Sequence, residues 1–131
     1  MSKRIQIRSS KAAPASGSYA QALKCGNLFF TTVVPYGMQC EIVGDTMAQQ
    51  TKQTMENLRY LLEEAGIGFD NVVKVTAYLY ESDTNFGEFA KVYESYFPEG
   101  DYPARSSHNA SLFVHEGRQC MLEMEVMAVF D

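Results

Sequence analysis

The chain has 131 residues, 46% of them hydrophobic, which fits one globular domain and excludes a disordered or fibrous chain. Its 11 basic and 16 acidic residues give a formal net charge of -5, which argues against nucleic acid as the principal ligand because phosphate backbones require a basic surface. No run of about 18 apolar residues occurs, so neither secretion nor a membrane span is expected, and a cytoplasmic protein is predicted.

The first half of the chain has the pattern of three strands followed by a helix. The turn Cys25-Gly26-Asn27 separates two runs of strand character and predicts a hairpin. Apolar residues at helical spacing then predict a helix with Asp45 as its N-cap and Gly66 as its C-terminal stop. In order, the expected elements are an edge strand over Arg4 to Arg8, strands over Tyr19 to Lys24 and Leu28 to Val34, and a helix over Thr46 to Ala65.

The second half continues with a buried strand, a helix and two closing strands. Aromatic residues recur along one stripe of this helix, which is typical of core packing. Ser82 or Asp83 is expected to cap the helix, and a loop through His115-Glu-Gly117 is expected between the last two strands. The expected elements are a strand over Val72 to Tyr80, a helix to about Phe97, and strands over Pro103 to Leu112 and Cys120 to Phe130.

This order predicts a single α+β domain over residues 1–131, with ferredoxin-like layering, a mixed sheet and two helices on one face. The last strand is apolar on both faces. Because two helices cover only one face of such a sheet, the other is expected to be buried by another copy of the chain, which predicts a homo-oligomer. By alternation, one side of that strand carries Leu122, Met124, Val126, Ala128 and Phe130, and the other carries Met121, Glu123, Glu125, Met127 and Val129.

Cysteine and histidine give no sign of a metal site or a disulfide framework. Cys25, Cys40 and Cys120 are odd in number and lack C-x-x-C spacing, so they are expected to be reduced residues of the core type. His108 is expected on the strand face opposite Arg105, and neither it nor the loop histidine has a second plausible ligand nearby. No metal is therefore predicted.

Two charged groups on the closing strands point to chemistry. Glu123 and Glu125 share a partly apolar face, so at least one carboxylate needs a cationic or hydrogen-bonded partner. Arg105 shares its face with Ser107 and Asn109, and its planar fork suits bidentate binding of a substrate carboxylate. On these residues alone, an equally good interpretation is that Arg105 pairs with Glu123 or Glu125 on an adjoining strand.

Six segments in unbroken order span nearly the whole chain: Gly17-Ser-Tyr-Ala-Gln-Ala, Gly26-Asn-Leu-Phe-Phe-Thr-Thr, Gln53-Thr-Met-Glu-Asn-Leu, Val72-Val-Lys-Val-Thr, Pro103-Ala-Arg-Ser and Leu122-Glu-Met-Glu-Val. Together they resemble the Rid family, also called YjgF-like, which includes reactive-intermediate deaminases and is also described as L-PSP endoribonuclease-like. The last two segments, at their usual separation, are the most specific.

This resemblance implies a homotrimer of chorismate-mutase-like α+β subunits, with three clefts at the subunit interfaces and no cofactor. RidA-type members hydrolyse 2-imino or enamine acids to 2-keto acids and ammonia. Carried onto matching positions, Arg105 holds the substrate carboxylate, Glu123 positions or activates the attacking water, and Tyr19 lines the cleft. An imine carbon is already electrophilic, so a fixed carboxylate, a placed water and a proton source suffice for its hydrolysis.

The chain departs from the family pattern at three further binding positions. Thr31-Thr32-Val33-Val34 stands where RidA-type members have Thr-Ser-Gly-Gln, so Thr32 keeps a hydroxyl but the glycine is absent. Ser107 replaces the common cysteine after Arg-Ser, and Tyr93 replaces the usual asparagine of the second helix. These changes predict a pocket of altered size and polarity, suited to a larger acid such as an aminomuconate-type ring-cleavage product.

Two functions of different classes remain open from the sequence. One is a cofactor-free deaminase of an imine or enamine conjugated to a carboxylate. The other is a non-catalytic trimer that binds small carboxylates or partner proteins through Arg105. Endoribonuclease activity is a weaker third interpretation, because the acidic chain shows no basic or aromatic RNA-binding platform. Glu123 distinguishes the first two interpretations, because only the deaminase requires this residue.

Overall fold

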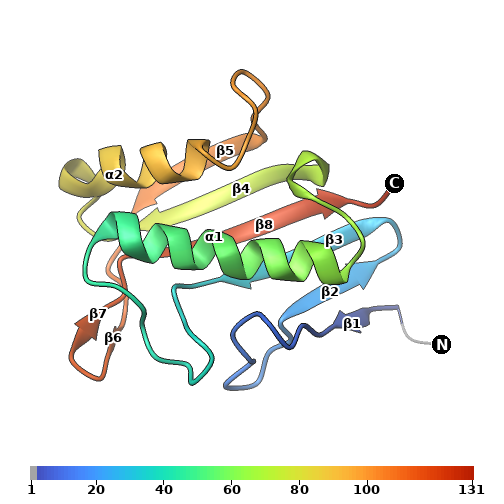
Figure 1. Cartoon of the computed structure of the whole chain (residues 1–131), viewed down its shortest axis with the longest axis horizontal. Coiled ribbons are helices and arrows are strands. Elements are labelled where there is room, and N and C mark those ends of the chain that lie inside the picture. Colours follow the sequence, from blue (N-terminus) through green and yellow to red (C-terminus); the bar gives the residue numbers. More distant parts are fainter. Residues whose placement is uncertain (1–2) are drawn as a thin grey trace.

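The protein has two layers, a six-stranded sheet and two helices that pack on one of its faces (Figure 1). The computed structural model describes residues 3–131. The predicted α+β fold is confirmed. In chain order the elements are β1 Ile5–Ile7, β2 Ala22–Cys25, β3 Leu28–Val33, α1 Met47–Glu64, the short 3-10 helix η1 Phe69–Asn71, β4 Val72–Leu79, α2 Ser82–Glu94, β5 Ala104–Asn109, β6 Val114–His115, β7 Arg118–Gln119 and β8 Leu122–Val129.

The sheet is mixed, with strand order β1-β2-β3-β8-β4-β5. Neighbouring strands are antiparallel except β4 and β5, which are parallel. Parallel neighbours need a crossover connection, and α2 provides it between β4 and β5. This crossover makes β5 the outermost strand and leaves β4 between β5 and β8.

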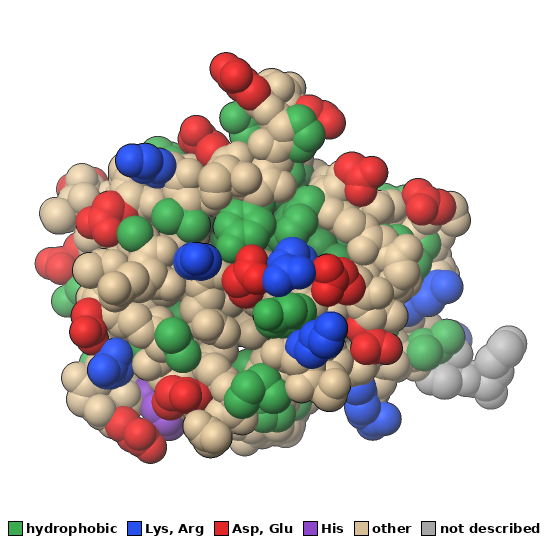
Figure 2. Space-filling model, in the orientation of Figure 1, with side chains coloured by type: hydrophobic (Ala, Val, Ile, Leu, Met, Phe, Trp, Pro, Cys, Tyr) green, Lys and Arg blue, Asp and Glu red, His purple; other side chains and the backbone are tan. Residues whose placement is uncertain are grey.

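The core lies between the helices and one face of the sheet. On β8, Leu122, Met124 and Val126 are buried, as the alternation predicted, and α1 contributes Leu58 and Leu62 with almost no exposed surface. Each such side chain stabilises the fold by about 1.5–3 kcal/mol relative to exposure. Figure 2 shows the helix-covered face from outside, where acidic and basic side chains are interspersed rather than separated.

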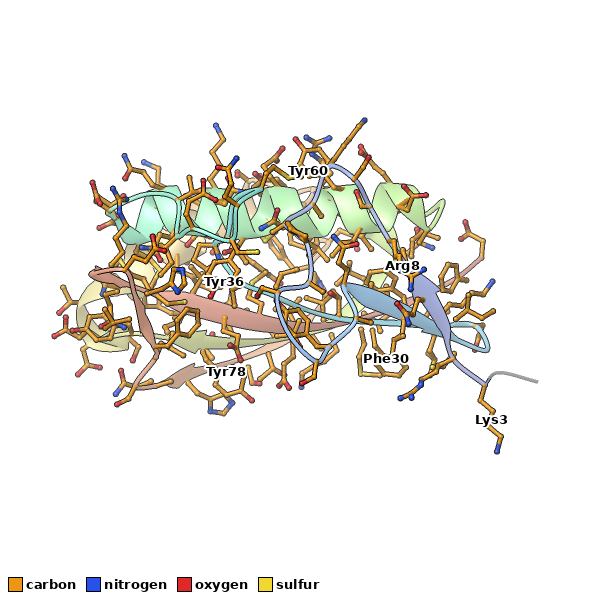
Figure 3. All side chains as sticks on the ribbon, turned by 90° about the horizontal axis from the view of Figure 1, so that it is seen from below. Lys3, Arg8, Phe30, Tyr36, Tyr60 and Tyr78 are labelled. Atoms are coloured by element: carbon orange, nitrogen blue, oxygen red, sulfur yellow. The ribbon has the colours of Figure 1, made fainter. Side chains whose placement is uncertain are left out.

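The second face of the sheet has no covering layer among residues 3–131. Figure 3 shows Phe30 of β3 and Tyr78 of β4 on the side of the sheet away from α1. Met127 of β8 is also on this face, where it is only partly buried. Its burial by a second copy of the chain stays a prediction. Neither helix in this part of the chain is long and apolar enough to cross a membrane.

The N-cap residue of α1 is Thr46, which forms a capping box, so the prediction of Asp45 as N-cap is wrong. The Thr46 hydroxyl accepts a hydrogen bond from the Gln49 amide at 3.1 Å, and the Gln49 side chain accepts one from the Thr46 amide at 3.3 Å. Asp45 instead forms an exposed ion pair with Arg118 of β7 at 2.9 Å. The glutamine three residues after Thr46 is the sequence signal that distinguishes the two candidates.

The second helix is capped from a distant strand, and the predicted caps Ser82 and Asp83 lie inside the helix. The N-cap residue is Glu81, whose φ of 46° is in the left-handed region and whose side chain makes no capping bond. The Ser82 amide donates instead to Asn109 Oδ1 of β5 at 3.0 Å. The helix ends at Glu94, one turn before the predicted end.

Two strands are shorter than predicted, and one predicted loop is a hairpin. Tyr19 lies in a turn before β2, with its amide bonded to the Gly17 carbonyl at 2.9 Å. Strand β5 ends at Asn109, the residue that caps α2. Between β6 and β7, Glu116 and Gly117 have φ values of 50° and 78°, the left-handed pair that a two-residue hairpin turn requires.

The capping geometry predicts different effects for two adjacent substitutions. Thr46→Ala should lower the free energy of unfolding by about 1 kcal/mol, because it leaves the Gln49 amide without its partner. Asp45→Ala should change it by less than about 0.5 kcal/mol, because an exposed ion pair contributes little. Urea denaturation of both variants measures the difference. Equal effects would contradict the assignment of Thr46 as the N-cap.

Candidate active site

The open face of the sheet contains a hollow of about 770 Å³, here called the open-face hollow. Strands β3, β4 and β8 form its floor, and the segment before β2 and Phe113 contribute to its wall. A concave surface with a few converging polar groups is the usual form of a small-molecule site. Its main polar lining residues are Tyr19, Thr32, Lys74, Thr76, Glu123 and Glu125.

Glu123 is a carboxyl group in this hollow whose environment is perturbed by burial and by a like charge. Strand pairing places it opposite Tyr78 and places Glu125 opposite Thr76. Burial, and secondarily the charge of Glu125, raise the pKa of the Glu123 carboxyl above its ordinary value. Within residues 3–131 the Glu123 carboxylate has no hydrogen bond or ion pair. The hydrogen-bonded partner expected for at least one of the two carboxylates belongs to Glu125, whereas Glu123 is suited to take up and release a proton.

Glu125 is fixed in place rather than free. The Tyr78 hydroxyl donates a hydrogen bond to Glu125 Oε1 at 2.9 Å, and this bond is the largest contribution to a raised pKa of Tyr78. Thr32 of β3 pairs with Glu125 across the strands, so its hydroxyl side chain lies on the same face. The two glutamates thus differ: one is held by a phenol and exposed, and the other is half-buried without a partner.

Tyr19 lines the hollow although it lies outside the strand predicted for it. About half of its surface is exposed, and its hydroxyl accepts a hydrogen bond from the Ser16 amide at 3.0 Å. The Ser16 hydroxyl lies 3.0 Å from the same oxygen. These contacts orient the Tyr19 ring at the wall of the hollow.

Lys74 and Thr76 are lining residues that the sequence reasoning missed. They alternate with Val75 and Ala77, which are fully buried on the helix side of β4. The strand was interpreted as buried, but these two polar residues are two positions apart and so lie on one face of it. This spacing could have indicated a polar face. Lys74 forms no ion pair or hydrogen bond within the part of the chain that the structure describes.

Arg105 lies on the other side of the sheet. It pairs in register with Val75, and its guanidinium carbon lies 5.0 Å from the ring centroid of Tyr93, 5.4 Å from that of Phe86 and 5.6 Å from that of Phe89. These three rings of α2 are here called the aromatic platform. They stabilise the cation through their faces. Among residues 3–131, Arg105 makes no hydrogen bond and no ion pair, so its N–H donors are available.

The predicted site residues therefore form two separate groups within one chain. Tyr19, Thr32 and Glu123 meet in the open-face hollow, whereas Arg105 and Tyr93 meet on the helix side. Ser107 shares the strand face of Arg105 by alternation and is exposed. The two groups are not brought together.

The interpretation that Arg105 pairs with Glu123 or Glu125 is wrong within the described chain. Strand β5 does not adjoin β8, because β4 lies between them. Arg105 also faces the helices, whereas Glu123 faces the hollow. His108 does lie on the face opposite Arg105, as predicted, where its ring stacks on Tyr78 at 5.6 Å.

The cysteines are free thiols, and only one of them is a core residue. Cys120 is buried, whereas Cys25 and Cys40 are partly exposed, so the prediction of core-type packing holds for Cys120 alone. Burial raises the pKa of the Cys120 thiol to about 12. No group of three or more His, Cys, Asp or Glu side chains that could hold a metal ion occurs within residues 3–131.

The chain is an α+β domain whose sheet is uncovered on one face among residues 3–131 and has a hollow there. A family model described as Endoribonuclease L-PSP matches residues 10–130, and the chain belongs to this family, the YjgF/Rid family that its motifs indicated. A RutC family protein of Pyrococcus abyssi is 37% identical over 130 residues, which cover 98% of each chain.

Two further relatives extend this comparison to function and structure. A 2-iminobutanoate/2-iminopropanoate deaminase of Rattus norvegicus is 34% identical over 127 residues, which cover 94% of this chain and 88% of the rat protein. The crystal structure of yeast Mmf1 matches with a TM-score of 0.86 at 31% identity, over 98% of this chain and 99% of that chain. The fold is therefore the family fold.

The coupling of the two glutamates is testable by titration. Glu125→Gln should lower the pKa of Glu123 towards the ordinary glutamate value, because a neighbouring negative charge that opposes ionisation is removed. Carbon-13 NMR of the glutamate carboxyl groups follows this change. Glu56 is the control, since its pKa is held low by a hydrogen bond from Arg59 on α1 and should not respond. An unchanged Glu123 titration would contradict the coupling.

Proposed function

We propose that the protein hydrolyses 2-imino or enamine carboxylic acids to 2-keto acids and ammonia, without a cofactor, in a site shared by two protomers of a homotrimer. The observation that carries this proposal is a pair of complementary groups without partners. Glu123 is a half-buried carboxylate with a raised pKa, and Arg105 is a cation held only by aromatic rings. Each is half of a site for a molecule with an anionic end and an electrophilic centre.

A protonated 2-imino acid has this character, because its carboxylate adjoins a positively charged C=N group. The Arg105 fork suits the carboxylate, which it would bind through two parallel N–H bonds. The negative field of Glu123 and Glu125 favours the iminium group and a water molecule beside it. Binding thus orients the electrophilic carbon towards the residue that activates water.

Glu123 is the proposed acid and base of the reaction. It accepts a proton from water as the water oxygen bonds to the imine carbon and the C=N electron pair moves to nitrogen. It then returns this proton to the nitrogen, so the C–N bond breaks and its electron pair leaves with ammonia. Loss of the hydroxyl proton to Glu123 forms the keto group. Burial, and secondarily the charge of Glu125, raise the pKa of the Glu123 carboxyl above its ordinary value, which favours its uptake of a proton from water.

The two halves require two protomers in this proposal. Arg105 and Glu123 face opposite sides of one sheet, so a small acid cannot contact both in the same chain. Strand β5 is outermost in the sheet, so its free edge is available to a neighbouring protomer. The trimer implied by the Rid resemblance would place Arg105 of one subunit at the hollow of the next.

The relatives and the residues of the site bear on the substrate. The rat relative named as a 2-iminobutanoate/2-iminopropanoate deaminase supports the reaction class. Thr32 in the hollow, and Ser107 and Tyr93 on the Arg105 side of the sheet, depart from the family pattern, which supports a larger imino or enamine acid. Three free thiols fit a reducing compartment, and a cytoplasmic location belongs to the proposal.

A second candidate is a non-catalytic protein that binds small carboxylates. It is favoured by the availability of the Arg105 donors, since anion binding needs the arginine half alone. Endoribonuclease activity, which the family description names, is less well supported. The net charge is -5, and Figure 2 shows no gathering of basic side chains on the helix-covered face.

Glu123→Gln separates the enzyme from the binding protein. It should lower the rate of keto acid formation about 100-fold or more, because a general acid and base is lost. Binding of 2-oxobutanoate, a stable product analogue, should persist in Glu123→Gln and weaken roughly 10-fold in Arg105→Ala, which loses charge-assisted hydrogen bonds.

The measurement generates an imino acid in situ with an amino-acid oxidase and follows its hydrolysis above the spontaneous rate. Glu64→Gln, an exposed change on α1, is the matched control and should have the rate of the unsubstituted protein. If the unsubstituted protein and Glu123→Gln both leave hydrolysis at the spontaneous rate while Arg105→Ala loses 2-oxobutanoate, the protein is a binding protein.

A further inference from the structure

We propose that Tyr93 is a positioning residue of the Arg105 anchor: its ring fixes the guanidinium, and its hydroxyl is a donor reserved for the carboxylate that Arg105 binds. This inference rests on the proposed role of Arg105. It adds a second hydrogen-bond donor to the carboxylate site.

The packing of the Tyr93 ring supports its role in fixing the Arg105 guanidinium. Of the three platform rings, Tyr93 is nearest the guanidinium carbon, at 5.0 Å. The ring is itself immobilised, since it stacks on Phe89 at 5.3 Å and packs against Phe97 at 5.1 Å, with only 1% of the residue exposed. A rigid platform orients the guanidinium without an ion pair. Because these contacts are cation–π contacts and not hydrogen bonds, they leave the Arg105 N–H donors for an anion.

The Tyr93 hydroxyl is left without a partner in the part of the chain that the structure describes. It is buried and has no hydrogen-bond partner within residues 3–131, a condition that only Thr51 shares among the buried side-chain polar atoms there. An unsatisfied buried hydroxyl destabilises a folded protein. A phenylalanine would supply the same ring face without this penalty, as Phe86 and Phe89 do. The hydroxyl is therefore explained by a partner that arrives when the site is filled.

The surroundings of the Tyr93 hydroxyl indicate which kind of group it would bind. Burial raises the pKa of Tyr93 to about 12, so at neutral pH the hydroxyl is protonated and donates. The charge of Arg105 acts on the same hydroxyl and opposes this rise, which places the two groups in electrostatic contact. A donor beside an unpaired guanidinium selects an anionic acceptor. The carboxylate oxygen is reached directly or through one bridging water.

Three variants and a control test the inference, with 2-oxobutanoate as the probe in calorimetry. Tyr93→Phe removes only the hydroxyl. It should weaken binding roughly 3- to 10-fold, the effect of one hydrogen bond, while thermal stability without ligand stays equal or rises. Tyr93→Leu also removes the platform ring and should approach the weak binding of Arg105→Ala. Phe29→Leu changes a buried β3 ring that packs on Phe130 and has no ring contact with Tyr93 or Arg105 among residues 3–131, so it should lower thermal stability and leave the affinity unchanged.

The outcomes separate this inference from the proposed function. If Arg105→Ala weakens binding but Tyr93→Phe binds normally, the hydroxyl has no such role and the inference is overturned while the anchor stands. The same holds if Tyr93→Phe changes subunit assembly alone, since the hydroxyl then serves an interface. If Arg105→Ala itself binds 2-oxobutanoate normally, the anchor and the proposed function both fail. With imino acid substrates, Tyr93→Phe should raise KM and leave kcat nearly unchanged.

Discussion

The alternation of side chains across β8 is the constraint on which the site depends. Leu122, Met124 and Val126 anchor one side of the strand under the helices, and this packing turns Glu123 and Glu125 to the open face. A shift of one residue in register would exchange the two sets, burying both carboxylates in the core. The same packing that stabilises the fold therefore fixes the acidic groups of the hollow and creates the environment that raises the pKa of Glu123.

The crossover through α2 places Arg105 on the helix side of the sheet, opposite to the two glutamates. It places β5 parallel to β4 at the edge of the sheet and turns Arg105 towards the aromatic platform. Within residues 3–131, a carboxylate and a guanidinium that both lack hydrogen-bonded and ionic partners thus lie on opposite faces of one protomer. Self-association is the simplest way to unite them, and it would also cover the partly apolar open face. In this account, assembly and catalysis have the same structural cause.

Local patterns predicted much of the fold, since α1 and the two-faced character of β8 both follow from periodicity. The order of strands did not follow, because nothing in the side-chain pattern shows that β4 lies between β5 and β8. The incorrect alternative that Arg105 pairs with Glu123 or Glu125 therefore stayed open. Asn109 caps α2 across the sheet, a tertiary contact that local cap rules cannot anticipate. The Rid resemblance indicated the site residues, but their separation into two groups required the three-dimensional arrangement.

The shared site is tested most directly by mixing two inactive chains. Glu123→Gln and Arg105→Ala subunits carrying different tags can be co-expressed and purified through both tags. If each site takes Glu123 from one protomer and Arg105 from the next, one site in every mixed trimer is intact, and roughly a third of the normal rate should return. Mixed assemblies as inactive as their parents would contradict the account, because both residues would then act within one chain.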